Sequence, residues 1–359
     1  MVKVSVILTS LSPSISLSLM IDFCVSPLAT FEELSSTHDS TYIKRFLEGD
    51  QTEKEQRNVG FPWSTEGVDR ALSSVGGTLA AACFVCEHER ARRSELVAEG
   101  AITNSSAALN SNRSSLPAWA AHIAGGTHHA FYDYGEGFSV FSDMAVAANV
   151  VLDKYPDVIQ NNILMIDLDV HQGNGNAVLF QTPKERASLN QNKKHREEGT
   201  YHNNSDRVFT FSMHCSGNYF SQKQDSDLDI ELPIGCKDNA YLMTLNHWLN
   251  RFKRVHLQAD ESSREQPSSP KPHRWDLIIF QAGVDVLDDD RLGRMALSQK
   301  GVKRRNELVY KFASDLGIPM VICMGGGYPK NDDGWDSIIE THSDVYFGAH
   351  EFLSSLSLD

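Results

Sequence analysis

Positive charge is scarce in this chain. Its 33 lysine and arginine residues stand against 47 acidic residues, which gives a formal net charge of −14. Such a balance argues against a broad surface for the phosphate backbone of a nucleic acid, and we expect no direct nucleic-acid binding. The charge is compatible with a basic or cationic substrate, although a solvated acidic surface accounts for the same composition.

Cysteine is also infrequent, with six residues scattered over 359 positions. Small secreted domains instead concentrate cysteines in a disulfide framework, so this pattern indicates a reducing, intracellular setting. Cys83 and Cys86 form a Cys-x-x-Cys pair inside an apolar helical run, but no second pair lies nearby. We therefore expect both to be core residues rather than metal ligands.

The N-terminal part lacks a membrane-spanning segment. Residues 1–29 are rich in serine and apolar residues, but Pro13 and the interspersed serines interrupt any transmembrane helix, and we expect no membrane partner. The segment also lacks the arginines that organelle-targeting leaders favour. Residues 1–36 therefore stay open between a leader and a replaced first strand, for which Val2–Leu8 is the candidate.

From residue 116 onward, strand-like and helix-like runs alternate. Apolar runs predict strands at Ala118–Ala124, Ile163–Leu168, Val208–Met213, Leu277–Ala282 and Met320–Met324, and helical spacing predicts helices at 143–154, 239–257 and 299–316. The alternation predicts an α/β protein, a single-domain three-layer α/β/α structure with a mainly parallel central sheet. A length of 359 residues and a hydrophobic fraction of 41% are those of a soluble globular protein.

We predict one main domain over residues 37–353, followed by a tail at 354–359. Helices are expected at 37–47 and from Ser64 onward, with a charged loop at 50–57 between them. Segments rich in charge, serine, asparagine or proline near 87–115 and 258–274 are predicted to be loop insertions.

The most informative stretch is Ile163–Gly175, in which a buried strand is followed by Asp167, Asp169 and His171 and then by a Gly-Asn-Gly turn. Side chains two residues apart on an extended segment point the same way, so Asp169 and His171 could bind one metal ion together. An oxygen and a nitrogen ligand suit zinc. An isolated Asp-x-His is more often a helix cap beside a satisfied histidine, so the pattern needs support from elsewhere in the chain.

Three further strand ends supply that support. Each runs from a strand into glycine and then into a histidine pair, an aspartate or a tyrosine: Gly125-Gly-Thr-His-His-Ala130, Phe280-Gln-Ala-Gly-Val-Asp285 and Met324-Gly-Gly-Gly-Tyr328. Ligands bind at the carboxyl ends of strands in parallel α/β sheets, and four such ends are hard to assign to packing. No Lys-Ser/Thr follows the glycine triplet, so it does not indicate a phosphate-binding loop.

Together these motifs resemble those of the zinc-dependent histone deacetylase family, whose members have the arginase-deacetylase fold. The resemblance covers Thr37 to Leu353, which would form a deacetylase catalytic domain, with the motifs in the family's order and spacing. Asp-Val-His-Gln-Gly-Asn-Gly and Asp290-Arg-Leu-Gly-Arg294 are most similar to the class IV branch. The long insertions and plain leader suggest a plant member.

The resemblance implies a role for each motif residue. One Zn²⁺ per chain would be bound by Asp169, His171 and Asp285, leaving the open position of a catalytic site. His129 would act as general base with Asn174 behind it, and His128, held by Asp167, would supply electrostatic support. Tyr328 would stabilise the oxyanion. The tunnel for the acyl-lysine would be lined by Gly137, Phe138, Leu292, Gly326 and Gly327, the last two letting the strand turn so that Tyr328 faces the metal. A structural K⁺ is implied at Asp167, Asp169, His171, Ser212 and Met213.

The implied reaction is zinc-dependent hydrolysis of an N-acyl-lysine amide on a histone or another protein. The implied setting is regulation of chromatin and transcription in the nucleus and/or cytoplasm, with corepressor proteins as partners. Two departures from the family pattern bear on this. Asn174 stands where class I relatives have an aspartate, so His129 should be a weaker base. Phe61 takes the place of an aspartate that holds the substrate backbone in many relatives, which makes a small acylated amine an alternative substrate.

Two other functions are alternatives. A two-metal ureohydrolase of the same fold would need an aspartate two residues after His171 and another beside Asp285, where this chain has Gly173 and Val286 or Leu287. A non-catalytic scaffold that binds acyl-lysine is disfavoured, because every catalytic position is filled. The N-terminal strand and helix that are usual in the family are shortened or replaced in this chain. Lower stability and less than full activity are possible consequences of this difference.

Overall fold

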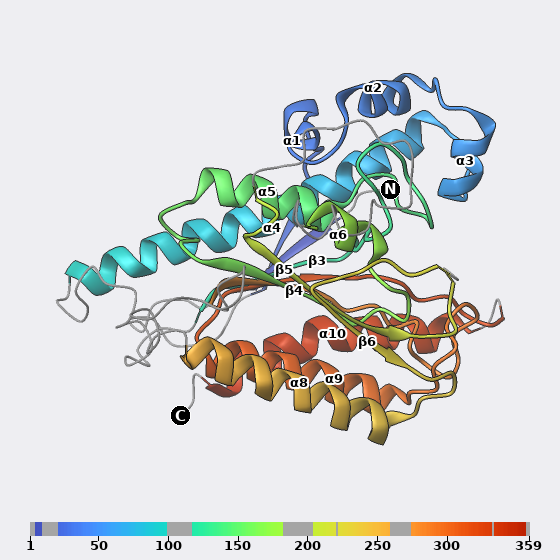
Figure 1. Cartoon of the computed structure of the whole chain (residues 1–359). Helices are drawn as coiled ribbons and strands as arrows, with labels where there is room; N and C mark the ends of the chain where they lie inside the picture. Colours follow the sequence, from blue (N-terminus) through green and yellow to red (C-terminus); the bar gives the residue numbers. More distant parts are fainter. Residues whose placement is uncertain are drawn as a thin grey trace.

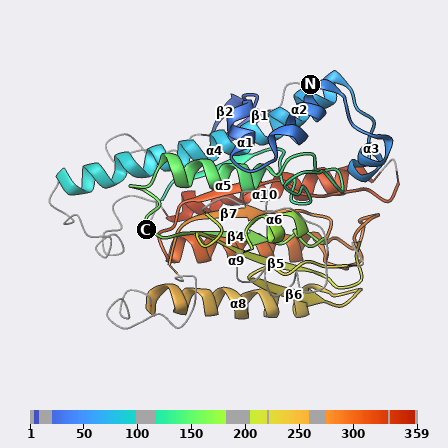
Figure 2. The same ribbon diagram turned by 45° about the horizontal axis from the view of Figure 1, so that its top comes forward.

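The computed structural model describes residues 4–8, 21–98, 117–181, 204–219, 222–258, 274–331 and 334–356. Within these residues an eight-stranded sheet has the order β2-β1-β3-β8-β7-β4-β5-β6. The strands from β3 to β6 along this order are all parallel: β3 (Trp119–His122), β8 (Met320–Cys323), β7 (Trp275–Gln281), β4 (Asn162–Asp167), β5 (Val208–Cys215) and β6 (Leu228–Leu232). At the other end of the sheet from β6, β1 (Val4–Leu8) and β2 (Ile21–Val25) add an antiparallel pair (Figure 2).

Helices cover both faces of the sheet, as Figure 1 shows. One layer contains α4 (Thr65–Ala98), α5 (Asp143–Lys154) and α6 (Asn174–Leu179), and the other contains α8 (Asp238–Gln258), α9 (Gln299–Asp315) and α10 (Trp335–Leu356). Side chains alternate along the strands between two cores: Ile163 and Met165 lie in one, Leu164 and Ile166 in the other. The predicted three-layer α/β/α fold with a mainly parallel sheet is confirmed.

Three short helices, α1 (Phe31–Ser35), α2 (Ser40–Glu48) and α3 (Glu53–Val59), pack with the start of α4 around a third core. The prediction of a loop at 50–57 was wrong, because Thr52 and Glu55 form a capping box that starts α3. The prediction of a helix at 37–47 was correct apart from its start, since Asp39 caps α2 by accepting a hydrogen bond from the Tyr42 amide at 2.8 Å.

The loop insertion predicted at 87–115 was wrong in its first part. α4 continues to Ala98, and its polar end is tied to the protein by Arg90, whose guanidinium donates to Asp157 at 2.6 Å. Residues 99–116 and most of the second predicted insertion, 259–273, lie outside the described residues. The strand interpretation of Val2–Leu8 holds for the backbone at Val4–Leu8, which forms β1.

Among the described helices, α4 has one segment, Thr65–Glu95, that is long and apolar enough to cross a membrane. However, 56% of the residues in its most apolar window are buried inside this protein, where α4 packs against α5 and β3. Burial of this kind is typical of a core helix. In α4, Cys86 is buried in the core and Cys83 is partly buried against it, and neither is bonded to another cysteine.

The sheet order brings the four motifs together. β3, β8, β7 and β4 are immediate neighbours, and each is followed by one of the four glycine-containing stretches. Because these strands are parallel, their carboxyl ends meet at one edge of the sheet. Side chains from residue 125 to residue 328 therefore converge on a single site.

Candidate active site

Asp169, His171 and Asp285 come together at this edge. The Nδ1 atom of His171 lies 3.1 Å from a carboxylate oxygen of Asp169 and 3.1 Å from one of Asp285. One ligand atom from each residue lies within 4.8 Å of the others, and within the described part of the chain this is the one group with such geometry. The backbone holds both carboxylates, because Val170 N–H donates to Asp285 and Gly326 N–H donates to Asp169, each at 2.9 Å.

The electrostatics of this group fit a metal cation. Burial raises the pKa of Asp285 to about 7, and the negative charge of Asp169 adds to the effect. Burial opposes a charge on His171, but the two carboxylates outweigh it and raise its pKa to about 10. Carboxylates crowded in a buried place are costly unless a cation balances them. Two oxygen ligands and one nitrogen ligand are a donor set that zinc accepts.

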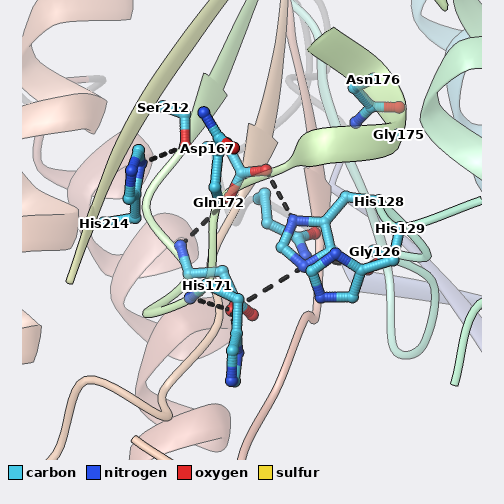
Figure 3. A network of polar contacts seen from close by, with 12 residues as sticks. Gly126, His128, His129, Asp167, His171, Gln172, Gly175, Asn176, Ser212 and His214 are labelled. Carbon is cyan, nitrogen blue, oxygen red and sulfur yellow. Dashed lines mark hydrogen bonds and ion pairs between the residues drawn. The ribbon is translucent and has the colours of Figure 1, made fainter. Parts of the chain in front are cut away.

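The histidine pair lies beside His171 (Figure 3), and His128 Nε2 is 3.8 Å from an Asp169 oxygen. His128 Nδ1 lies 2.6 Å from Asp167 Oδ2, and the rings of His128 and His129 are 4.0 Å apart between centroids. Burial opposes charging of His128, but Asp167 and Asp169 outweigh it and raise its pKa to about 9. Burial, followed by the charges of His128 and His171, instead lowers the pKa of His129 well below the usual value. At neutral pH the pair is therefore a charged histidine beside a neutral one.

The tautomer of His129 follows from its partner. Asn174 Oδ1 lies 2.7 Å from His129 Nδ1 and also accepts from the Gly175 amide at 3.0 Å, while the Asn174 amide nitrogen donates to Glu136 at 3.4 Å. These contacts orient the amide so that its oxygen faces the ring, and His129 Nδ1 must carry the proton. The lone pair is then on Nε2, which is the ring atom that can act as a base.

Tyr328 belongs to a loop that Asp290 holds. The Asp290 carboxylate is buried and accepts hydrogen bonds from the backbone N–H groups of Tyr328 (2.6 Å), Leu292 (2.8 Å) and Gly293 (2.7 Å). Burial, together with the charges of Asp285 and Asp169, raises the pKa of Tyr328, so its phenol stays protonated and can donate a hydrogen bond.

The glycines before Tyr328 act differently from the prediction. Only Gly325 has a positive φ (72°), so the predicted turning role does not rest on Gly326 and Gly327. They are constrained by space instead: a Cβ on Gly326 would lie 2.3 Å from Asp285 Oδ2, and one on Gly327 would lie 2.6 Å from His342. Gly173 is constrained in the same way, since a Cβ there would lie 2.3 Å from Asp167. The ureohydrolase alternative, which needs an aspartate at residue 173, therefore fails on space as well as on residue type.

Phe138 and Leu292, predicted to line the substrate tunnel, are both exposed hydrophobic residues, 47% and 37% accessible. The Phe138 ring lies 6.1 Å from that of Tyr328 between centroids. Phe138 is the one non-glycine residue with a positive φ (64°) among those described, and Gly137 and Phe138 donate backbone hydrogen bonds to Asn58 and Val59 at the end of α3. A strained backbone conformation of this kind persists only where contacts with the surrounding structure hold it in place, and such conformations are common at ligand-binding sites.

A largely apolar cavity of about 660 Å³ adjoins the loops, with Gly125, Thr127, Phe138 and Met324 in its wall. Phe61 also lies in this wall, where its ring contacts the Arg70 guanidinium at 4.4 Å. Phe61 offers no acceptor for a substrate backbone.

Of the residues predicted to bind potassium, Ser212 contacts His214 Nδ1 at 2.9 Å and Met213 is buried in the core. The potassium ion stays a prediction.

Comparison with known proteins identifies the family. The model of the histone deacetylase domain matches residues 1–342. The chain belongs to the histone deacetylase family. An uncharacterised protein of Picosynechococcus sp. is 35% identical over 298 residues, which cover 83% of this chain and 76% of that protein. Histone deacetylase 2 of Arabidopsis thaliana is 28% identical over 59% of this chain, but the match spans only 45% of the plant protein.

Solved structures show the same fold for this deacetylase-family chain. A histone deacetylase homologue from Aquifex aeolicus matches with a TM-score of 0.58 at 20% identity, covering 91% of this chain and 72% of the homologue. A histone deacetylase homologue in complex with SAHA matches with a TM-score of 0.56 at 21% identity, over 92% and 72%. Membership of the family makes the protein a hydrolase of the deacetylase type. The class IV and plant assignments stay predictions.

Several residues around the site of this deacetylase-family protein were not predicted from the sequence. Asp143 and Gln281 hold the histidine loop, Asp290 holds the tyrosine loop, and Glu136 contacts Asn174. Asn218 contacts His171 Nε2 at 3.2 Å and donates to the Leu292 carbonyl at 2.9 Å. Asp290 and Gln281 offered a signal, since Asp290 opens the Asp-Arg-Leu-Gly motif and Gln281 lies in the stretch that leads to Asp285. The others are single polar residues with no distinctive spacing.

Proposed function

We propose that this protein hydrolyses the amide bond of an N-acyl-lysine side chain, with one Zn²⁺ bound by Asp169, His171 and Asp285. The observation that carries the proposal is the convergence of these ligands with the His128–His129 pair, in which His128 Nε2 lies 3.8 Å from Asp169 and the His129 ring lies 5.8 Å from that of His171 between centroids. When bound, the zinc would polarise the amide carbonyl and lower the pKa of water.

The protein's own residues would move the protons. Nε2 of His129 would take the proton of the attacking water and later deliver a proton to the leaving amine, while its Nδ1–H stays on Asn174 Oδ1. His128 would remain charged beside Asp167 and favour the negative charge that develops on the substrate oxygen. The Tyr328 hydroxyl would donate to that oxygen, a contact that strengthens in the transition state.

The substrate proposal rests on the family and on the site rim. Phe138 and Leu292 present apolar surface suited to the methylene chain of a lysine. A small acylated amine is the second candidate, and Phe61 is the observation that favours it, because an aromatic ring cannot accept a hydrogen bond from a peptide backbone in the way a carboxylate does. Action on histones in the nucleus, with corepressor proteins, is proposed from the family resemblance alone.

A panel of substrates tests the proposal. Peptides with lysine acylated by chains of increasing length and small acetylated diamines would be incubated with the purified protein, with and without chelator, and the released amine and acid measured. We expect chelator-sensitive hydrolysis that returns on addition of Zn²⁺. Hydrolysis of the diamines but not of the peptides would favour the second candidate. A metal-loaded protein that cleaves none of these substrates would contradict both.

A further inference from the structure

The loop that carries the two histidines is built around a buried carboxylate. Gly125 and Gly126 have φ angles of 77° and 79°, a left-handed conformation that turns successive N–H groups to one side. Asp143, at the first turn of α5 and fully buried, fills this concavity. It accepts from Gly126 N–H at 2.9 Å, from Thr127 N–H at 2.7 Å and from the Thr127 hydroxyl at 2.7 Å.

A second layer of buried polar groups holds Asp143 in turn. The Thr78 hydroxyl donates to Asp143 Oδ2 at 2.5 Å and lies 3.0 Å from His122 Nδ1. Since the single hydroxyl proton is directed to the carboxylate, His122 Nδ1 must donate to the Thr78 oxygen. Thr78, His122 and Asp143 are all 0% exposed. The chain of hydrogen bonds therefore ends on the Asp143 carboxylate and fixes its orientation.

The opposite side of the same loop is held from β7. Gln281 donates its side-chain amide to the Gly126 carbonyl at 2.9 Å. There is no room for other side chains here, because a Cβ on Gly125 would lie 2.4 Å from Asp143 and one on Gly126 would lie 2.2 Å from Gln281. The peptide between Gly126 and Thr127 is thus clamped at its N–H by Asp143 and at its carbonyl by Gln281. The next residue in the chain is His128.

We infer that Asp143 is a positioning residue for the His128–His129 pair, acting through the backbone of Gly126 and Thr127. The inference rests on the proposed function for the role of the histidines, and deepens it by naming what holds them. Asp143 bonds the histidine loop, whereas the side chains of the metal-binding group are held by Val170, Gly326 and Asn218. Its loss should therefore affect proton transfer and spare metal binding.

The test replaces Asp143 by Asn, which has nearly the same volume. An amide N–H₂ in the place of Oδ2 would face the Thr78 hydroxyl and the Gly126 N–H, which are donors, and could not accept their hydrogen bonds. Asp153→Asn is the matched control, because Asp153 is exposed near the other end of α5. We expect Asp143→Asn to lower kcat on the order of 100-fold, as a displacement of about 1 Å can. KM and the content of one zinc per chain should stay unchanged, and the acid limb of the pH–rate profile should change shape. A loss of folded protein would instead scale the whole profile by one factor.

A second pair of variants covers the case in which Asp143→Asn does not fold. Thr78→Val removes the bond to Asp143, and Thr78→Ser retains it. We expect a lower kcat for the valine variant and near wild-type kcat for the serine variant. Equal kcat in the two, or an Asp143→Asn protein as active as the control, would overturn the inference.

A readout independent of activity separates this inference from the proposed function. Hydrogen–deuterium exchange at the amides of residues 125–130 should be faster in Asp143→Asn than in wild type and in Asp153→Asn. If the wild-type protein cleaves no acylated substrate but the exchange behaves in this way, the proposed function fails and the positioning role stands. Unchanged exchange would refute the positioning role whatever the activity.

Discussion

Replacing Asn174 by Asp would change the basicity of His129. The substitution places a negative charge 2.7 Å from Nδ1, where the wild type has a neutral amide oxygen. An opposite charge at such a distance raises a histidine pKa by roughly 1–3 units, and a shift of about 2 units corresponds to roughly 3 kcal/mol in favour of the imidazolium. Because burial and the neighbouring histidines lower the pKa of His129 in the wild type, its neutral form persists to low pH.

The direction in which the pH–rate profile moves follows from the role of His129 as a base. His129 accepts a proton only when it is neutral, so activity is lost on the acid side as pH falls through its pKa. Raising this pKa moves the acid limb of the kcat/KM profile upward by about the same number of units. The assay is hydrolysis of a fluorogenic acetyl-lysine peptide between pH 5 and pH 9 at saturating zinc. Asn176→Asp is the matched control, because Asn176 lies in the same helix but accepts from Ser142 at 2.6 Å.

Glu136 complicates the variant and offers a check. It accepts from the Asn174 amide, and burial raises its pKa. An aspartate at residue 174 would lose that bond and repel Glu136, so part of the new charge would be neutralised by proton uptake. The double variant Asn174→Asp/Glu136→Gln removes the repulsion and should show the larger shift. An acid limb that stays in place in both variants would refute the assignment of His129 as the base.

Three further results are expected. Tyr328→Phe should lower kcat by about 10²–10³-fold, the usual cost of one oxyanion donor, while metal analysis still finds zinc; unchanged turnover would contradict the role. Chelation should abolish turnover and lower Tm, because a ligand that binds only the folded state stabilises it, and added Zn²⁺ should restore both; a metal-free protein with full activity would exclude the centre. His256 has a pKa lowered to about 4, by burial and then by Arg274, and its Nδ1 accepts from Trp275 N–H at 3.2 Å. The unfolded chain binds that proton more tightly, so stability should fall as pH drops from about 6.5 toward 4, by about 2 kcal/mol at pH 5. Urea unfolding at pH 5 and pH 7 measures this difference, and His256→Asn should remove most of it.

The sequence carried enough information to predict five of the parallel strands and the convergence of their motifs, whereas β2 and β6 were not predicted. Ile163–Ile166 is an uninterrupted apolar run, as a strand buried on both faces must be, and it forms β4. Asp169 and His171 follow with a spacing of two. The sequence of a single strand did not indicate which other strand would lie beside it. That Asp285 meets Asp169 depends on β7 pairing with β4, a contact between residues more than one hundred positions apart.

Local capping explains where the helix predictions failed. The stretch at 50–57 has the high charge of a loop, yet Thr52 and Glu55 satisfy each other's backbone N–H groups and start α3. α4 continues past Cys86 because its charged side chains find partners, Arg90 with Asp157 and Arg92 with Glu89. Polar composition alone does not distinguish such a helix from an insertion.

The role of Asp143 in holding the histidine loop could not be predicted from the sequence for a different reason. Asp143 sits in a run that predicts a helix, and an aspartate at a helix start is a common capping residue. Only the three-dimensional position shows that it faces the Gly125–Thr127 loop. Gly125 and Gly126 allow other groups to come close to the backbone, and the groups that do so are the Asp143 carboxylate and the Gln281 amide.

The order in which the strands are synthesised differs from the order in which they stand in the sheet. β4, with Asp169 and His171 just beyond it, leaves the ribosome long before β7 and β8, which lie between it and β3. Until those later strands insert, the nascent chain can offer a cation only two of its three ligands, and pairing between such distant segments is slow. A metal bound by Asp169, His171 and Asp285 would therefore have all three ligands only after β7 has been synthesised, and a product interrupted before residue 285 would lack one of them.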